Sequence, residues 1–230
     1  MKPKQEMNYL ENYFMNAPKK YPLRKWWHYF DVYDRHFSRF RGKNPVVLEI
    51  GVDHGGSVEM WKDYFGDGSK IFGVDTNERC RTIELPDVEI FIGDQGDPNF
   101  WSQIKETLPK VDILIDDGGH TMHQQKVTYE CMYNHVKSDG VYLCEDTHTS
   151  YRPEYGGGYR NQNSFLEYSK NFIDMLNAYH LEGLVQGNPD FGKTGDYIPF
   201  RQATHSFHCY DSIIVLEKKE DLEIPYHELR

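Results

Sequence analysis

The stretch ILIDDGGH (Ile113–His120) joins a short apolar run to two adjacent carboxylates, two glycines and a histidine. A continuous apolar run that ends at turn residues is typical of a buried parallel strand. In open α/β sheets, ligands bind outside the carboxyl ends of such strands. We therefore expect Asp116, Asp117 and His120 to lie together at the mouth of a cleft. Carboxylates there can hold a cation, and an imidazole can transfer a proton near neutral pH.

A glycine-rich loop follows an earlier strand, VVLEIG (Val46–Gly51), and leads to Ser57, a suitable N-cap for a helix. Glycines let a ligand approach the backbone closely, and a helix N-terminus offers free N–H groups. Asp75 ends the next strand, at the place where an acid typically binds a ribose diol. Asp94 follows the third strand and can meet an adenine or ribose edge. Three such features on successive strand ends predict a ligand that contains a nucleoside.

These features resemble the class I S-adenosylmethionine-dependent methyltransferases. The motif ExGxxxG, an acid after the second strand and GD after the third match that family's cofactor sites. The resemblance implies a Rossmann-like α/β fold, with a seven-stranded, mostly parallel sheet and a C-terminal antiparallel hairpin. The sequence departs from the family at Asp53, where many members have a second glycine. The residues assigned to S-adenosylmethionine are Glu49, Gly51, Gly55, Ser57, Asp75, Asp94, Gln95 and Asp116.

The strand VYLCED (Val141–Asp146) also ends in acids. In the methyltransferase fold this strand lies beside Ile113–Asp116, about 4.8 Å away. We therefore expect the acids that end the two strands to face each other. Uncompensated carboxylates raise one another's pKa, and a hard divalent cation such as Mg²⁺ relieves that conflict. The alternative is that one or two of these carboxylates only cap helices or accept backbone N–H groups.

Four segments together resemble a narrower family, the Mg²⁺-dependent sugar O-methyltransferases of macrolide and tetracenomycin biosynthesis. The segments are LEIGVDHGGSVEMW, IFIGDQGDP, IDDGGHTMHQQ and YLCEDTHTSYRPEYGGG. The resemblance covers roughly Val46 to Glu217. It implies that Asp117, Glu145 and Asp146 bind the metal and that His120 is the general base.

The chemistry expected of these residues is methyl transfer to a sugar hydroxyl, whose pKa lies far above neutral. Mg²⁺ lowers that pKa and orients the attacking oxygen. His120 then takes the proton, and the methyl group passes in line from the sulfonium. His148 and Tyr151 are weaker candidates for substrate contacts, and a packing role is about as probable for either.

The elements that position these residues follow from hydrophobic periodicity, which alternates between strand and helix and so indicates βαβ units. The expected strands are Val46–Ile50, Lys70–Val74, Val88–Ile92, Ile113–Asp116 and Val141–Cys144. The expected helices are Trp26–Arg41, Ser57–Phe65, Asn99–Thr107, Met122–Val136 and Ser164–Tyr179. We expect one domain over residues 1–230, with a helical lead-in over 1–45 and a lid loop over 147–163. Ser206–Tyr210 and Ile213–Glu217 should form the hairpin.

The bulk properties of the 230-residue chain set limits on its partners. A net charge of −10 argues against a general nucleic-acid binder. No apolar run approaches the ~20 residues that span a membrane, the first residues lack the apolar core of a signal peptide, and the four cysteines have no zinc-site spacing. We expect a cytoplasmic protein that acts on a small-molecule or glycan acceptor, without nucleic-acid or membrane partners. The aromatic stretch Trp26–Phe40 should pack on the core or on a second subunit, so a homo-oligomer is expected; the alternative is that this helix also covers the cofactor or substrate cleft.

The sequence is also compatible with three other functions. The acceptor could instead be a catechol-like diol, because Mg²⁺ and vicinal oxygens serve both chemistries. A nucleoside-binding module without turnover would not need the clustered groups Asp117, His120, Glu145 and Asp146. An NAD-dependent oxidoreductase ranks last, because Asp53 interrupts the G-x-G-x-x-G fingerprint.

Overall fold

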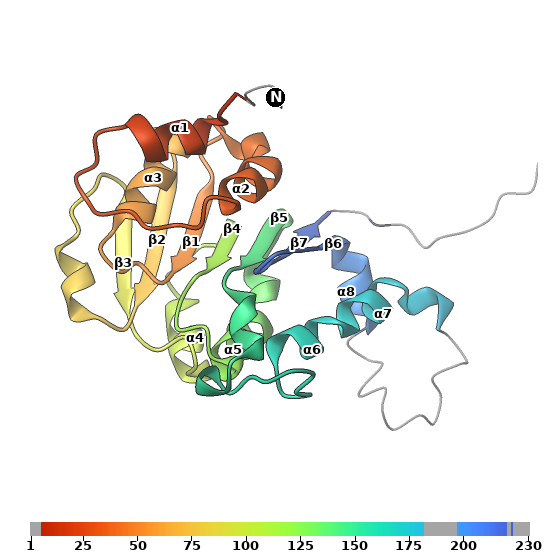
Figure 1. Cartoon of the computed structure of the whole chain (residues 1–230). Coiled ribbons are helices and arrows are strands. Elements are labelled where there is room, and N and C mark those ends of the chain that lie inside the picture. Colours follow the sequence, from red (N-terminus) through yellow and green to blue (C-terminus); the bar gives the residue numbers. More distant parts are fainter. Residues whose placement is uncertain (1–5, 182–196, 220–221, 223–230) are drawn as a thin grey trace, which may run out of the picture.

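The computed structural model describes residues 6–181, 197–219 and 222. A seven-stranded sheet with the order β3-β2-β1-β4-β5-β7-β6 runs through the molecule (Figure 1). The strands are β1 (Val46–Ile50), β2 (Lys70–Asp75), β3 (Val88–Ile92), β4 (Val111–Asp116), β5 (Val136–Cys144), β6 (Thr204–Tyr210) and β7 (Ile213–Lys218). The first five pair in parallel, and β7 is antiparallel to both β5 and β6. The predicted mostly parallel sheet with a C-terminal antiparallel hairpin is confirmed.

The helices agree with the predicted set in order but are shorter, and several continue as 3-10 turns. The α-helices are α1 (Tyr9–Asn16), α2 (Tyr29–Phe37), α3 (Gly56–Phe65), α4 (Pro98–Ile104), α5 (Met122–Met132), α6 (Phe165–Ser169), α7 (Asn171–Leu176) and α8 (Tyr197–Ala203). The 3-10 helices are η1 (Ser38–Phe40), η2 (Glu78–Thr82), η3 (Tyr133–His135), η4 (Thr147–Tyr151), η5 (Pro153–Tyr155) and η6 (Ala178–His180). No helix among the described residues is long and apolar enough to cross a membrane.

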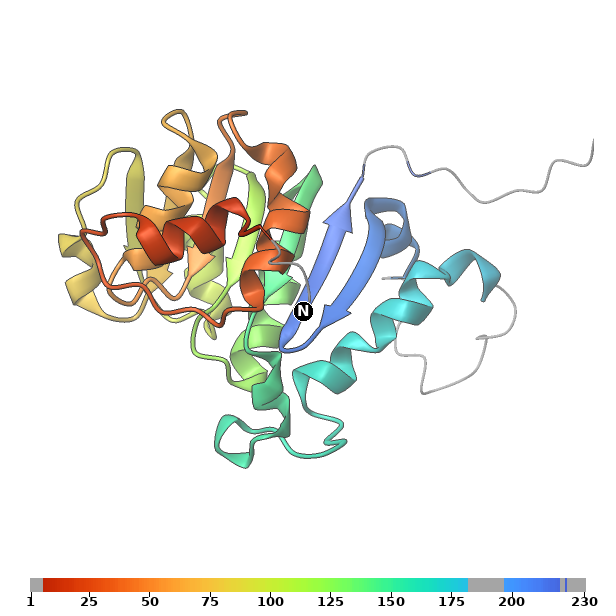
Figure 2. The same ribbon diagram turned by 45° about the horizontal axis from the view of Figure 1, so that its top comes forward.

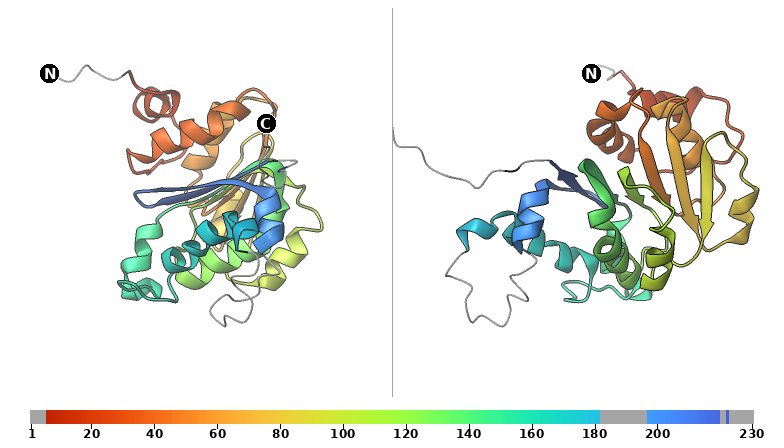
Figure 3. Two further views of the ribbon diagram at one scale, coloured as in Figure 1. Left: turned by 90° about the vertical axis from the view of Figure 1, so that its right-hand side faces the viewer. Right: turned by 180° about the vertical axis from the view of Figure 1, so that it is seen from behind.

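Helices cover both faces of the sheet, as the left view of Figure 3 shows. Side chains alternate between the faces along each strand. Val47 and Ile113 therefore join a core with α1, α2 and α3, whereas Leu48 and Leu114 join a core with α4, α5 and the helices that follow. Because both faces of the sheet are covered, the sequences of the parallel strands are nearly continuous hydrophobic runs.

The aromatic N-terminal region packs on its own sheet. The expected helix over Trp26–Arg41 begins later, at Tyr29, and ends in the 3-10 turn η1. Tyr29, Phe30, Tyr33 and Phe37 are all buried in the core that α2 shares with α3. The aromatic stripe therefore stabilises this chain's own fold, and assembly with a second copy stays a prediction.

Residues 147–163, predicted to be a lid, form the short turns η4 and η5 below the carboxyl ends of the strands (Figures 1 and 2). The single helix predicted for Ser164–Tyr179 is divided into α6, α7 and η6. Figure 2 shows these helices beside the blue hairpin of β6 and β7. Helix α8, which leads into β6, was not predicted.

Candidate functional site

The acids at the ends of β4 and β5 lie side by side because the two strands are paired in register. Asp116 is opposite Cys144, and the Glu145 N–H donates to the Asp116 carbonyl at 2.8 Å. Asp117 donates its N–H to the Ile50 carbonyl of β1 at 2.9 Å. We call Asp117, Glu145 and Asp146 the carboxylate rim. The predicted juxtaposition of these acids is thus present in the structure.

Two residues of the site have the left-handed backbone conformation that residues other than glycine rarely adopt. They are His120 (φ 57°) and Asp146 (φ 51°). Such conformations cost free energy and gather at functional sites. The surrounding structure fixes both, because Thr149 donates its hydroxyl to the His120 carbonyl at 2.9 Å and Tyr29 donates its hydroxyl to Asp146 Oδ1 at 2.5 Å.

His120 faces the rim. Its Nε2 lies 3.5 Å from Asp146 Oδ2 and 3.9 Å from Asp117 Oδ1. Its Nδ1 is buried and has no hydrogen-bond partner among the described residues. The His120 side chain is 19% exposed, so a ligand can reach it. This placement suits a proton acceptor that carboxylates hold in position.

A lysine that the sequence did not indicate lies against the rim. Lys25, from the segment between α1 and α2, places its Nζ 2.5 Å from Asp117 Oδ2 and 2.9 Å from Glu145 Oε2. Its side chain is only 3% exposed. The sequence could not indicate this contact, because Lys25 lies about 90 residues before Asp117, within the predicted lead-in.

Electrostatics explain why a lysine can be buried there. Burial alone would lower the pKa of Lys25, but Asp117 and Glu145 raise it, so the amine is charged. Burial and the neighbouring Asp117 raise the pKa of Glu145 well above its usual value, while Lys25 opposes that shift. The conflict among carboxylates expected from the sequence therefore exists, and in this structure an ammonium group relieves part of it.

Two of the rim carboxylates, together with His120, form a donor set that fits a divalent cation, and Glu145, the third predicted ligand, is outside that set. Ligand atoms of Asp117, His120 and Asp146 lie within 4.8 Å of one another. Glu145 Oε1 is buried without a hydrogen-bond partner among the described residues, although Tyr33 is close enough to influence the pKa of this carboxyl group. Carboxylate oxygens are the ligands that Mg²⁺ prefers. Because Lys25 already contacts Asp117 and Glu145, an ion bound by the whole rim would share these oxygens with the ammonium group or displace it.

A cavity of about 530 Å³ opens beside the rim. This volume is within the range of small-molecule and cofactor sites. Its wall includes the glycine loop after β1, the end of β2, the segment from Pro22 to Lys25 and the turn that carries Asp117 and His120. A side chain at Gly51 would collide with the Asp117 carbonyl, so only glycine permits this approach of the two strand ends.

A second cavity, of about 340 Å³, also borders the rim. It shares Lys25, Asp117 and Asp146 with the first cavity and adds Glu145, Tyr29 and Trp26. Trp26 is 59% exposed. The rim therefore stands where two cavities meet, one lined by the glycine loop and the other partly aromatic.

Four of the predicted cofactor residues, Gly51, Ser57, Asp75 and Gln95, line the larger cavity. Asp75 Oδ2 accepts the N–H groups of Val52 and Asp53, both at 2.9 Å, and thereby shapes the glycine loop. The role of Asp75 toward a ribose stays a prediction.

Two predicted residues lie behind the loop. Glu49 is fully buried and accepts hydrogen bonds from the Ser57 hydroxyl at 2.8 Å and the Trp61 indole at 2.9 Å. Burial raises its pKa to about 7. Gly55 is the N-cap of α3 in a left-handed conformation (φ 86°), where a side chain would meet Ile83, and it does not line the cavity. Both residues support the loop.

Of the predicted cofactor residues, Gln95 and Asp116 are hydrogen-bonded to each other, whereas the Asp94 side chain lies apart from this pair. Gln95 lines the cavity and donates to Asp116 Oδ1 at 2.8 Å, and its Oε1 accepts the Gly119 N–H at 2.7 Å. Asp116 is buried, which raises its pKa to about 7. Asp94 is outside the cavity wall and accepts the Gly96 N–H at 2.8 Å.

Asp53, the departure from the family pattern, has φ 47°, a conformation that glycine adopts freely. Its side chain is exposed and pairs with Arg24 and His54. Asp53 also lines the larger cavity.

The two weak substrate candidates differ in position. His148 Nδ1 lies 3.9 Å from Asp146 Oδ1, beside the rim. Tyr151 is exposed and lines a separate cavity with residues of the 158–173 region. The structure brings only His148 near the other site residues.

Comparison with known proteins gives relatives of one kind, although no family model matches the chain. Demethylmacrocin O-methyltransferase of Streptomyces fradiae is 30% identical over 212 residues, which are 86% of this chain and 51% of that protein. Mycinamicin VI 2″-O-methyltransferase of Micromonospora griseorubida is 37% identical over 169 residues, 69% of this chain and 42% of that protein. The chain spans about half the length of the curated relatives it matches.

A solved structure supports the same relationship. The MycE methyltransferase of the mycinamycin pathway, in complex with Mg, S-adenosylhomocysteine (SAH) and mycinamycin VI, superposes with a TM-score of 0.72 at 30% identity. The superposition covers 86% of this chain and 51% of MycE. The predicted methyltransferase fold and the predicted resemblance to macrolide and tetracenomycin sugar O-methyltransferases are confirmed.

Proposed function

We propose that this chain, a relative of the macrolide and tetracenomycin sugar O-methyltransferases, is an S-adenosylmethionine-dependent O-methyltransferase that acts on a sugar hydroxyl of a glycosylated small molecule. The observation that carries the proposal is the position of the rim at the junction of two cavities. A methyl donor in one cavity and an acceptor in the other would meet at Asp117, Asp146 and the nearby His120. Holding two reactants in line is the main source of rate in such a transfer.

The larger cavity is proposed for the cofactor. Its volume of about 530 Å³ and its wall of glycine loop, Ser57 and Asp75 suit a nucleoside with a short charged tail. The exposed backbone at Gly51 permits close approach, and Asp75 lies at the strand end where an acid can accept ribose hydroxyls.

The smaller cavity is proposed for the acceptor sugar. Trp26 offers an exposed aromatic face, on which the apolar face of a sugar ring can pack. Tyr29 and the rim supply polar groups that can orient the hydroxyls. An acceptor bound here would leave its reacting oxygen next to His120.

In the proposed reaction, the acceptor O–H bond and the S–CH₃ bond break as the O–CH₃ bond forms. The sulfonium becomes a neutral thioether, and His120 Nε2 receives the proton. Asp117 and Asp146 stabilise the imidazolium that results, because both carboxylates lie within 4 Å of that nitrogen. Mg²⁺, which Asp117, Glu145 and Asp146 would hold, would lower the pKa of the acceptor hydroxyl.

The direct test supplies methyl-labelled S-adenosylmethionine with sugar acceptors, such as rhamnosylated polyketides, and separately with catechols. The proposal expects labelled product and SAH with a glycoside, and loss of turnover in EDTA. Turnover with catechols alone would replace the sugar by the diol acceptor. A lack of methyl transfer to every acceptor, despite cofactor binding, would favour a nucleoside-binding module.

A further inference from the structure

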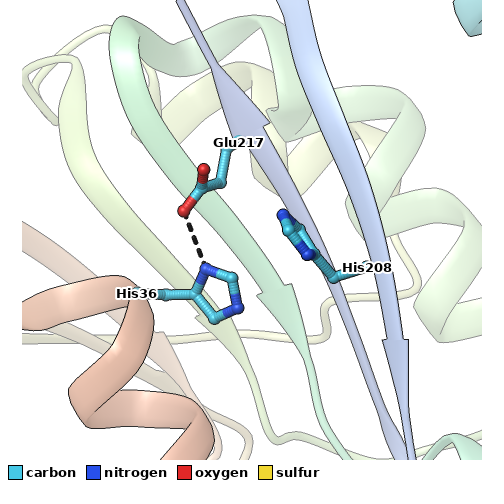
Figure 4. A group of neighbouring side chains, drawn as sticks. All are labelled: His36, His208 and Glu217. Carbon is cyan, nitrogen blue, oxygen red and sulfur yellow. Dashed lines mark hydrogen bonds and ion pairs between the residues drawn. The ribbon is translucent and has the colours of Figure 1, made fainter.

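A second group of metal-binding side chains lies outside the rim and its two cavities. We call His36 of α2, His208 of β6 and Glu217 of β7 the histidine cluster. Figure 4 shows the three side chains converging from the helix and the two strands. One ligand atom from each lies within 4.8 Å of the other two.

The cluster is compact and partly enclosed. His36 is only 2% exposed, and its Nδ1 lies 2.7 Å from Glu217 Oε1. The ring centroids of His36 and His208 are 4.7 Å apart. His208 and Glu217 are half-buried, so an ion can enter from solvent.

We propose that the histidine cluster binds Zn²⁺ through His36, His208 and Glu217, with water in the fourth position. Two imidazoles and one carboxylate are a ligand set that Zn²⁺ uses with tetrahedral geometry. Ligand atoms ~2.0–2.1 Å from one tetrahedral ion are ~3.4 Å apart. The His36–Glu217 distance of 2.7 Å and the 4.8 Å limit on the whole group lie on either side of that spacing. Imidazole donors favour Zn²⁺ over Mg²⁺, which prefers oxygen.

The neighbours of His36 already have the arrangement that a metal-binding histidine needs. Its Nε2 lies 2.9 Å from the Tyr210 hydroxyl. Without metal, Nδ1 donates to the Glu217 carboxylate, which can only accept, and a neutral His36 can accept the Tyr210 O–H at Nε2. With Zn²⁺ on Nδ1, the proton moves to Nε2 and donates to the Tyr210 oxygen, so no proton is lost. An oxygen partner on the second nitrogen is the usual support of a metal-bound imidazole.

The charge near the cluster permits one such ion. The hydrogen bond from His36 lowers the pKa of Glu217, which is therefore ionised, and burial lowers the pKa of His208, which is therefore neutral. Both are the forms that bind metal. Arg35 and Arg39 are the opposing positive groups close enough to influence these residues. Arg39 is paired with Asp139 at 3.2 Å, which reduces its effect.

A bound ion would join the N-terminal helix α2 to the C-terminal hairpin, which lies about 170 residues later in the chain. Such a cross-link stabilises the native state, since Zn²⁺ bound to that state alone raises stability by mass action. The inference does not depend on methyl transfer.

The test measures Zn²⁺ binding to the full chain by equilibrium dialysis, in excess Mg²⁺ to occupy the rim, together with the thermal midpoint with and without Zn²⁺. We expect one equivalent of Zn²⁺ and a higher midpoint in the wild type. His208→Ala should weaken binding at least about tenfold and abolish the rise in midpoint. Glu217→Gln provides a second variant if His208→Ala does not fold.

Two matched controls locate the ion. His205→Ala removes an exposed histidine from the same strand, and Asp117→Asn alters the rim; both should keep the Zn²⁺ equivalent. Absence of Zn²⁺ binding in the wild type would overturn the proposal. So would binding that survives His208→Ala and disappears in Asp117→Asn, because the ion would then belong to the rim.

Discussion

The carboxylate rim and the histidine cluster both gather acids and histidines from distant parts of the chain, but they balance charge differently. In the rim, Lys25 pairs with Asp117 and Glu145, and the carboxylates line two cavities. In the cluster, each nitrogen of His36 already has a partner, and none of its three members lines these cavities. The rim thus has three carboxylates and two adjoining cavities, whereas the cluster has one carboxylate and lines neither cavity.

This difference distinguishes the proposed site of methyl transfer from the proposed site of stabilising metal binding. Strained backbone at His120 and Asp146 and an incompletely compensated Glu145 are features that a fold keeps for function. A satisfied network between α2 and the hairpin needs no such explanation. The predictions below test that contrast, beginning with the largest effect.

Replacement of His120, the proposed base, should show most clearly that turnover depends on the rim and not on the histidine cluster. His120→Ala removes the group that takes the acceptor proton, and turnover should fall by about 10²–10⁴-fold. Cofactor binding should remain, because His120 is only one of many groups in that wall. Initial rates and SAH calorimetry measure the two effects. His208→Ala is the matched control in the cluster and should keep turnover, so equal rates for both variants would remove the contrast.

Replacement of the buried lysine should reveal competition for the rim. Lys25→Met leaves Asp117 and Glu145 without their ammonium partner, and breaking a buried pair typically costs about 3–5 kcal/mol. We expect a lower free energy of unfolding in EDTA, measured by urea denaturation, and recovery with Mg²⁺. Mg²⁺ should also bind more tightly than in the wild type, as measured by calorimetry. Weaker Mg²⁺ binding in Lys25→Met would show that the lysine supports the metal site instead of competing with it.

The buried acid behind the loop should make stability depend on pH. The pKa of Glu49 rises from 4.5 to about 7 on folding, so the folded state binds more protons between these values. Its contribution to stability is complete below pH ~4.5 and is lost as pH rises to ~7. Glu49→Gln should flatten this part of the profile of unfolding free energy against pH. An unchanged slope would mean that Glu49 is ionised in the folded protein.

Removal of the exposed tryptophan should give the smallest effect. Trp26→Ala deletes an aromatic face worth about 0.5–1.5 kcal/mol in contact with a ring. The KM for the acceptor should rise several-fold while kcat and SAH affinity stay unchanged. Trp27→Ala, which alters the neighbouring exposed residue outside the smaller cavity, is the matched control. A similar KM in both variants would place the acceptor elsewhere.

Much of the sheet and the rim could be predicted from the sequence because the relevant signals are local. Apolar runs that end in acids mark β1, β4 and β5, and parallel pairing brings Asp117 beside Glu145 without further information. The glycine loop and Asp75 were found in the same way. The roles of these residues toward cofactor and metal stay predictions.

The position of Lys25, the histidine cluster and the separation of Asp94 from the cavity could not be predicted, because they depend on tertiary contacts that no local pattern encodes. Lys25 reaches the rim only because the segment between α1 and α2 crosses the glycine loop, with the Pro22 backbone against Gly56. The histidine cluster joins α2 to the hairpin. The alternation of side chains along β6 shows which residues share a face of that strand, but it does not indicate that His208 lies beside His36. Asp94 and Gln95 were both placed at the cofactor site by their motif, but only Gln95 lines the cavity.

The most direct test of the proposed function is calorimetric binding of SAH to the wild type, with and without Mg²⁺, repeated on Asp117→Asn. We predict saturable binding of one SAH per chain and a separate Mg²⁺ site that Asp117→Asn loses while SAH binding persists. If the folded wild-type chain binds no SAH, the larger cavity is not a methyl-donor site and the proposed function is contradicted.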